Sequence, residues 1–145
     1  MAKNWFECKI RYEKTMENGV GKKVTEPYLV DAFSFTEAEG RIIEEITPFI
    51  KGEFNVTDIK RANYSEVIQS ADTNADRWFK FKLQFIVLDE KSGKEKKTPC
   101  MVLVQAVDFK DSVKKLEDNM KGSMADYIIA SCNETALMDV YFYKQ

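Results

Sequence analysis

Histidine is absent from this chain of 145 residues, and cysteine, glycine and proline are scarce, with 3, 6 and 3 copies. The absence of histidine excludes Ser-His-Asp and Cys-His catalysis and metal sites built on imidazole ligands. Cys8, Cys100 and Cys132 lie far apart and form no CxxC pair, so we expect neither a disulfide framework nor a structural zinc site. Each cysteine lies in an apolar, strand-like run, which predicts buried, reduced thiols.

The chain also lacks a large net charge and a long apolar run. Its formal charge is -2 at pH 7, so any basic patch that attracts nucleic acid or an anionic membrane must be local. No apolar run approaches the length of a transmembrane helix, and no charged leader precedes an apolar core as in a secretory signal. Because 44% of the residues are hydrophobic and 32% are charged, we expect a globular, cytoplasmic protein without a membrane partner.

The two halves of the chain resemble each other. The segment GKKVT at 21–25 returns as GKEKKT at 93–98. Further matches recur at a spacing of 73 or 74 residues: Trp5 and Trp78, Lys9 and Lys82, Thr25 and Thr98, residues 30–35 and 104–109, and Val67 and Val140. Regular spacing over the full length predicts a tandem duplication, with a first repeat at 1–70 and a second at 74–145. The polar stretch 70–76 suits the connection between them.

Each half has the pattern of a β-β-α-β unit. Alternating apolar and polar residues predict a first strand at 5–13 and 78–89 and a second at 28–33 and 100–107, joined by glycine-containing turns. Helical periodicity then begins after Ser34 and Asp108, each an N-cap residue followed by an acid three positions later. Thr47-Pro48 and Lys121-Gly122 end the helices. A third strand is expected at 54–61 and 127–132.

This order of elements predicts an α+β fold with mainly antiparallel sheet. A helical crossover between the second and third strands places the third strand beside the first, in the order 2-1-3. One such unit has a weak core by itself. We therefore expect the two repeats to pack as one compact domain with pseudo-twofold symmetry. Its two helices would cover one face of two sheets, or of one continuous six-stranded sheet.

The first strand of each half has an apolar face, which belongs under the helix, and an opposite face that combines Trp with basic residues. Aromatic rings among cations suit single-stranded nucleic acid, because rings stack on bases and cations meet phosphates. We expect a non-enzymatic protein that binds single-stranded DNA or RNA without a cofactor. The candidate residues are Trp5, Lys9, Arg11, Trp78, Lys80 and Lys82 on the strands, and Lys22, Lys23, Lys94, Lys96 and Lys97 near the hairpin tips.

Two alternatives remain open. Apolar side chains at Leu29, Met101, Leu103 and Val107 join the open face, which favours a cover by the other half, a second copy in a homodimer, or a protein partner. A protein-interaction or assembly module of this kind would suit a phage or mobile-element accessory protein. The other alternative is a small-molecule binder with its ligand in the cleft between the halves. Lysines at hairpin tips also keep strand edges from aggregating.

Enzyme signatures are missing from the sequence. It contains no Gly-rich phosphate loop, no GxSxG and no HExxH motif. The acids of the first helical segment fit its solvated face, and the spacing of Glu66, Asp72, Asp76 and Asp139 does not require a metal site. We therefore expect no enzyme, no catalytic residue and no bound metal.

Several longer motifs resemble a known family. They are WFECK at 5–9, VTEPYLVDA at 24–32, FTEA at 35–38, DIKR at 58–61, DEKSGKEKK at 89–97 and GSMAD at 122–126. On these motifs, nearly the whole chain resembles an uncharacterised domain family of gut Bacteroidota and of bacteriophages that infect them. That family has no established activity. The resemblance implies a bacterial or phage setting, which mildly favours DNA metabolism or host–phage interaction, and it assigns no site residue.

Overall fold

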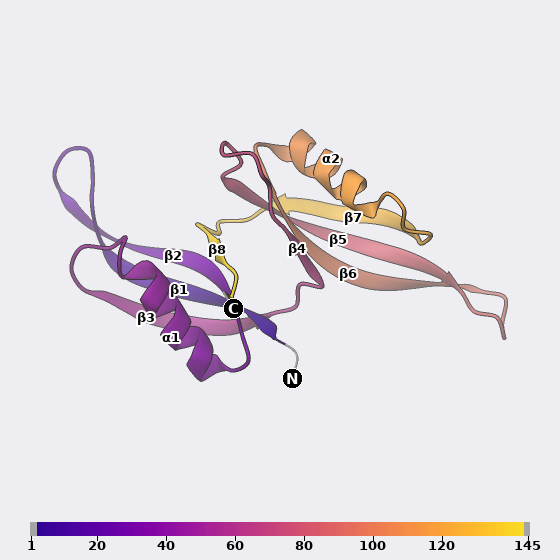
Figure 1. Cartoon of the computed structure of the whole chain (residues 1–145), viewed down its shortest axis with the longest axis horizontal. Coiled ribbons are helices and arrows are strands. Elements are labelled where there is room, and N and C mark those ends of the chain that lie inside the picture. Colours follow the sequence, from indigo (N-terminus) through magenta and orange to yellow (C-terminus); the bar gives the residue numbers. More distant parts are fainter. Residues whose placement is uncertain (1–2, 144–145) are drawn as a thin grey trace. The chain divides into compact units, whose positions relative to one another are not determined.

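The computed structural model describes residues 3–143, which form an α+β fold with two helices and two mainly antiparallel sheets of four strands each. The chain divides into two compact units. Unit 1 takes its residues from both ends of the chain, up to Asn63 and from Ala136 onward, and unit 2 comprises Tyr64–Thr135. Each unit has one sheet and one helix (Figure 1).

Unit 1 contains β1 (Asn4–Thr15), β2 (Gly21–Ala32), α1 (Phe35–Ile46), β3 (Phe54–Ala62) and β8 (Val140–Tyr141), with the sheet order β3-β1-β2-β8. Helix α1 begins where expected, because the side chain of Ser34 accepts a hydrogen bond of 3.1 Å from the backbone N–H of Glu37. The apolar stripe of α1, Ala38, Ile42 and Ile46, is buried against the sheet.

Unit 2 contains β4 (Glu66–Ile68), β5 (Arg77–Leu88), β6 (Glu95–Ala106), α2 (Phe109–Met120) and β7 (Asp126–Glu134), with the order β4-β6-β5-β7. Asp108 caps α2 by accepting a hydrogen bond of 2.8 Å from the backbone N–H of Asp111. The hairpin turns of the two units place Gly19 and Gly93 at φ +81° and +70°. These left-handed values favour glycine and explain why each turn contains one.

The helix-covered face of each sheet carries the core, as the alternation of the first strands predicts. Phe6, Cys8 and Ile10 of β1 are fully buried, and so are Phe81 and Leu83 of β5. Burial of such a side chain contributes about 1.5–3 kcal/mol to folding. The two cores are separate clusters, one under each helix. Among residues 3–143, neither helix has both the length and the apolar character needed to cross a membrane.

The expected strand order 2-1-3 is present in both units, and the chain forms two sheets, not one of six strands. The hairpins are longer than expected. The ladder of β1 and β2 continues outward to the pair Thr15 and Gly21, and that of β5 and β6 to Leu88 and Glu95. The sequence does not predict this length, because the outer ends of β2 and β6 are polar and have no alternation of apolar and polar residues.

Each sheet gains a fourth, parallel edge strand from the other half of the sequence. In unit 1, β8 pairs with β2 and aligns Val140 with Leu29. In unit 2, β4 pairs with β6 and aligns Val67 with Leu103. The boundary between the units therefore precedes β4, and the polar stretch 70–76 lies within unit 2. The sequence matches Val67 with Val140, but it does not predict that either residue lies in an edge strand.

The two sheets share a β-bulge at corresponding places. The register of β1 with β3 shifts between Lys9 and Ile10, which leaves Thr57 as the extra residue. The register of β5 with β7 shifts between Lys82 and Leu83, which leaves Ala130 as the extra residue, 73 positions after Thr57. Bulges increase the local twist of a strand and interrupt its ladder, so β3 and β7 have the same irregularity along their outer edges.

Removal of residues 139–145 tests the exchange of edge strands. We expect the truncated chain to lose amide exchange protection in β2 of unit 1, at Leu29, because its N–H loses the carbonyl of Asp139 that accepts its hydrogen bond. Unit 2 should keep its protection in β6, although the deleted residues belong to the same half of the sequence as β6. Hydrogen exchange followed by mass spectrometry measures both. Loss of protection in β6 with β2 unchanged would contradict the strand assignment.

Candidate functional site

In unit 1 the face that carries Trp5, Lys9 and Arg11 points away from α1, as expected. Its positive charge is partly balanced. Lys9 lies opposite Asp58 in the ladder of β1 and β3, and the neighbouring Glu7 forms an ion pair of 3.6 Å with Lys60. The sequence of β1 alone does not show that an acid on the adjacent strand β3 lies opposite Lys9. The ring of Trp5 packs edge-on against Phe142, with centroids 5.2 Å apart, and the side chain is half-buried.

In unit 2 the corresponding face carries Trp78, Lys80 and Lys82, but Trp78 is only 2% exposed. Its cross-strand partner Gln105 holds the segment 70–75 in place by accepting from the backbone N–H of Ser70 and donating to the carbonyl of Ala75. Ala75 and Leu103, also on this face, are buried as well. The Trp78 ring is thus shielded from solvent in this structure, and its role in nucleic-acid binding stays a prediction. Lys80 and Lys82 are exposed.

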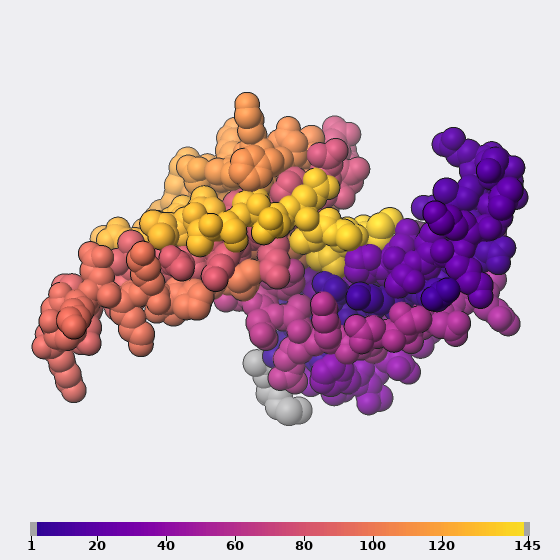
Figure 2. All heavy atoms as spheres, turned by 180° about the vertical axis from the view of Figure 1, so that it is seen from behind, coloured from indigo at the N-terminus to yellow at the C-terminus, as the bar shows by residue number. Residues whose placement is uncertain are grey.

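The hairpin tips carry the remaining candidate lysines, all exposed: Lys22, Lys23, Lys94, Lys96 and Lys97. In the space-filling view, the tip near residues 89–94 projects from the rest of its unit (Figure 2). The tips also contain acids. Residues 13–23 have three lysines and two glutamates, and residues 87–98 have four lysines and three acids. Each tip therefore has an excess of one positive charge, which is a weak attraction for a polyanion.

Beyond Trp5 and Lys9, the outer part of the unit 1 sheet forms a charged cleft of about 520 Å³. Arg11 and Lys23, two of the expected nucleic-acid contacts, lie in this cleft together with acids. Its lining residues are Arg11, Tyr12, Glu13, Thr15, Lys23, Lys51, Gly52, Glu53 and Asn55.

The positions 73 residues later in unit 2 are apolar. Ile86, Leu88, Met124 and Ile128 take the places of Glu13, Thr15, Lys51 and Asn55. We call these four the apolar patch. Leu88 is 63% exposed, Met124 99% and Ile128 40%. Ile128 lies opposite Gln84, which shares the non-helical face of β5 with Ile86 and Leu88. The sequence interpretation missed this patch, although a comparison of aligned positions in the two halves would have revealed it.

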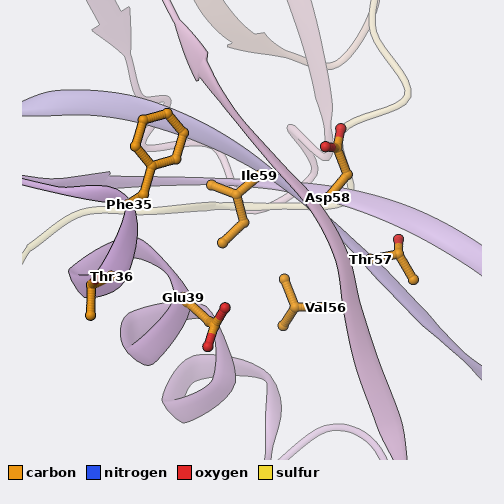
Figure 3. A pocket seen from close by; sticks show the side chains of 7 residues that line it. All are labelled: Phe35, Thr36, Glu39, Val56, Thr57, Asp58 and Ile59. Carbon is orange, nitrogen blue, oxygen red and sulfur yellow. The ribbon is translucent and has the colours of Figure 1, made fainter.

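A second cavity, of about 420 Å³, lies between α1 and β3 (Figure 3). Phe35, Val56 and Ile59 line it with apolar groups, and Glu39 reaches toward it from the helix. Thr36, Thr57 and Asp58 complete its lining. The groove is open to solvent, and its polar lining residues are exposed.

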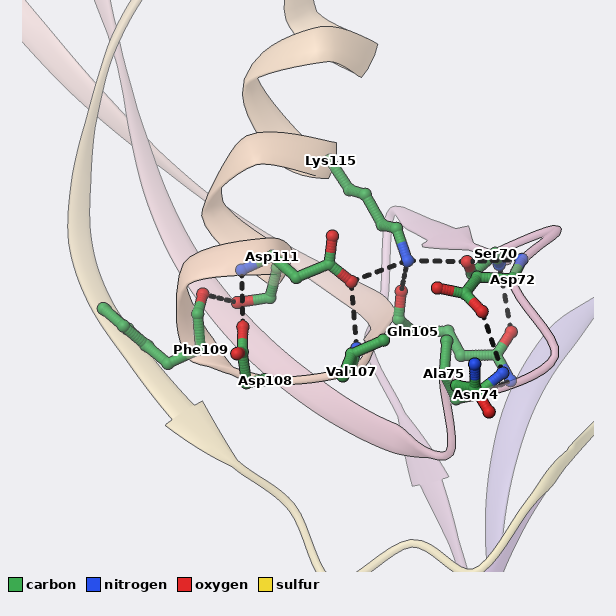
Figure 4. A network of polar contacts seen from close by, with 11 residues as sticks. Ser70, Asp72, Asn74, Ala75, Gln105, Val107, Asp108, Phe109, Asp111 and Lys115 are labelled. Carbon is green, nitrogen blue, oxygen red and sulfur yellow. Dashed lines mark hydrogen bonds and ion pairs between the residues drawn. The ribbon is translucent and has the colours of Figure 1, made fainter.

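A serine and a lysine approach each other closely in unit 2 (Figure 4). The Nζ of Lys115 lies 2.6 Å from the Oγ of Ser70 and 2.9 Å from a carboxylate oxygen of Asp111. The backbone N–H of Val107, followed by Lys115, lowers the pKa of Asp111. The Nζ of Lys115 also lies 3.4 Å from the backbone carbonyl of Gln105. The cluster therefore fastens the segment at Ser70 to helix α2 and strand β6.

Buried groups elsewhere are held in their neutral forms. Burial, with help from Glu7 and Asp58, raises the pKa of the Cys8 thiol to about 12. Burial, followed by the nearby Glu26, raises the pKa of Tyr28 to about 12. All three cysteines are free thiols, Cys8 buried and the other two half-buried. Across residues 3–143, no three His, Cys, Asp or Glu side chains converge as metal ligands do, and this includes Glu66, Asp72, Asp76 and Asp139.

The burial of Trp78 is testable by fluorescence. In the variant Trp5→Phe, the remaining Trp78 should emit at short wavelength and resist quenching by acrylamide, because its ring is shielded from solvent. In Trp78→Phe, the half-buried Trp5 should be quenched more readily. Steady-state and lifetime quenching measure the difference, with urea-unfolded protein as the reference. Equal quenching of the two single-Trp variants would contradict the burial of Trp78.

The raised pKa values of Cys8 and Tyr28 predict a loss of stability at alkaline pH. The neutral forms are favoured in the folded state, so their contribution is complete below the ordinary values of 9.0 and 10.0 and is lost as the pH rises toward 12. The urea midpoint should stay level from pH 7 to 9 and then fall. Tyr28→Phe should fall less steeply, since it has no phenol to ionise. An identical slope for both proteins would show that Tyr28 does not contribute.

Comparison with known proteins identifies one family. A family model described as a domain of unknown function (DUF4494) matches residues 4–143, which include both units. No curated protein matches the chain. Because the family model extends over nearly the whole sequence, the chain belongs to this domain family of unknown function.

Proposed function

We propose that the protein is a non-enzymatic protein-interaction module and that unit 2 carries its contact surface. The observation that supports this most is the apolar patch. At the same four places, unit 1 has polar side chains and an equivalent sheet, so the frame itself does not require apolar residues there. Exposed apolar side chains contribute favourable free energy only when another surface buries them away from water.

We also propose that the two halves arose by tandem duplication. Three features recur at a spacing of 73 or 74 residues and support it: the N-caps Ser34 and Asp108, the bulges at Thr57 and Ala130, and the edge pairs Leu29 with Val140 and Leu103 with Val67. Under this proposal, the two units can be compared position by position. A difference between aligned exposed residues then reflects the function of one unit and not a requirement of folding. The expected pseudo-twofold symmetry stays a prediction.

Single-stranded nucleic acid is the competing partner. Lys80 and Lys82 favour it, since both are exposed and have no ion-pair partner in the described part of the chain. The burial of Trp78 and the acids beside the hairpin lysines weaken it. A protein partner accounts for both the lysines and the apolar patch, whereas nucleic acid accounts for the lysines alone. A small-molecule ligand, a cytoplasmic location and a phage or mobile-element setting remain further predictions.

The double variant Leu88→Thr/Ile128→Asn tests the proposal by giving unit 2 the residues that unit 1 has. We expect its free energy of unfolding to change by no more than about 0.5 kcal/mol, because both side chains are exposed. Affinity purification from cells that carry the gene, with mass spectrometry, should recover a protein partner with the wild type and lose it with this variant.

The matched control is Val20→Thr/Ile43→Asn, which removes side chains of similar exposure, 59% and 40%, from unit 1. It should retain the partner. Labelled single-stranded oligonucleotides at low and moderate salt provide the competing measurement. Tight, salt-sensitive binding that Lys80→Glu/Lys82→Glu abolishes and Leu88→Thr/Ile128→Asn preserves would replace the protein partner by nucleic acid.

A further inference from the structure

Strand β7 is a long outer edge of the unit 2 sheet. It pairs with β5 on one side only and is nine residues long. The segment 127–133, YIIASCN, has no charge, no proline and no glycine. Ile128 and Ile129 are 40% and 39% exposed, on opposite faces of the sheet. A neutral edge rich in β-formers is a template for another strand unless something covers or interrupts it.

The corresponding edge of unit 1 is guarded by polar and charged side chains. Strand β3 has Asn55, Asp58 and Lys60 where β7 has Ile128, Ser131 and Asn133. Charged residues on an edge discourage pairing with a foreign strand. Both edges contain the bulge, which leaves Asp126–Ile129 and Ser131–Glu134 of β7 as regular stretches. The bulge is therefore common to both strands, whereas the charged side chains at these aligned positions are present in β3 and not in β7.

Two lysines lie beside this edge, and within residues 3–143 neither has an ion-pair partner. In the ladder of β5 and β7, Lys80 lies opposite Asn133 and Lys82 opposite Ser131. The aligned residues of unit 1 are Glu7, which pairs with Lys60, and Lys9, which lies opposite Asp58. Uncharged, short side chains on β7 leave the ammonium groups of Lys80 and Lys82 free to reach across it. The unguarded edge thus has an uncompensated positive charge on one face.

We infer that the partner contributes an extended, acidic segment that adds to the sheet as a strand along β7. Backbone hydrogen bonds to the edge would give affinity, and alternate side chains would give specificity. Acidic side chains of the segment meet Lys80 and Lys82 beyond Ser131 and Asn133, and apolar side chains pack on Ile128. This inference rests on the proposed interaction function and names the mode and the chemistry of the partner.

A second copy of the chain is a poorer occupant by the same criteria. In an antiparallel self-pair centred on Ala130, Asn133 would face Tyr127, and Ser131 would face Ile129, so no acid would meet the lysines. The same pair would bring Asp126 against Glu134, two like charges. Opposed like charges in a ladder are unfavourable. In this register, charge complementarity favours an acidic segment of a different protein over a second copy.

Phage display of random twelve-residue peptides on the immobilised full chain provides the probe. We expect the selected peptides to alternate Asp or Glu with Val, Ile, Leu or Phe. A synthetic, labelled copy of a selected peptide should lose at least tenfold in affinity for Lys80→Glu/Lys82→Glu, by fluorescence anisotropy. Lys9→Glu, at the position in unit 1 that aligns with Lys82, should bind within about twofold of the wild type.

Hydrogen exchange of the peptide complex locates the segment. Amides of β7 should gain protection, and those of β3 should not. Loss of binding in Leu88→Thr/Ile128→Asn would show that a peptide binds through the apolar patch. If such a peptide leaves β7 unprotected or carries basic residues, strand addition is wrong. The proposed interaction function would then still stand. Failure to select any peptide that depends on the patch would overturn both proposals. A dimer in sedimentation that Ile128→Asn dissociates would replace the acidic segment by a second copy.

Discussion

β2 and β6 each need a partner along their outer edge, and the rest of the architecture depends on how this need is met. Leu29, Val30, Leu103 and Val104 are buried along these edges. A buried backbone N–H or carbonyl without a partner destabilises a fold by about 1–3 kcal/mol. The chain after β7 satisfies β2, where Leu29 donates to Asp139 and Met138 donates to Pro27. The chain after β3 satisfies β6, where Ser65 donates to Met101.

The two exchanged segments are fastened by different chemistry at aligned positions. In unit 1, Arg41 binds Asp31 and lies over the ring of Tyr143. In unit 2, Lys115 binds Ser70, and Gln105 replaces the acid. The role of the helix cation is the same, to hold the segment that follows the edge strand. The fold therefore accepts different side chains even at positions that hold these segments in place. Exposed positions can vary more, because substitutions there usually change stability little.

The sequence predicted the elements whose signals are local. Alternation placed Phe81 and Leu83 under the helix, and the caps Ser34 and Asp108 fixed both helix starts. It did not predict β4 or β8, because strands of three and two residues give no periodic pattern and their pairing depends on residues far away in sequence. It placed Trp78 on the correct face but could not show that the side chain is buried there. Burial on a sheet is a tertiary property, decided by what covers the strand.

The candidate site shows the same limit and a way around it. Lys9 and Lys82 look equivalent in the sequence, yet Asp58 lies opposite one and Ser131 opposite the other. Only the ladder reveals that charge is balanced in unit 1 and uncompensated in unit 2. Comparison of aligned positions in the two halves then distinguishes residues that the fold requires from residues that are free to vary. Because Asn55 and Asp58 serve the same frame as Ile128 and Ser131, the neutral edge of β7 is not a requirement of the fold. The proposed partner strand would cover an edge that adds nothing to the stability of its own sheet and carries an aggregation hazard.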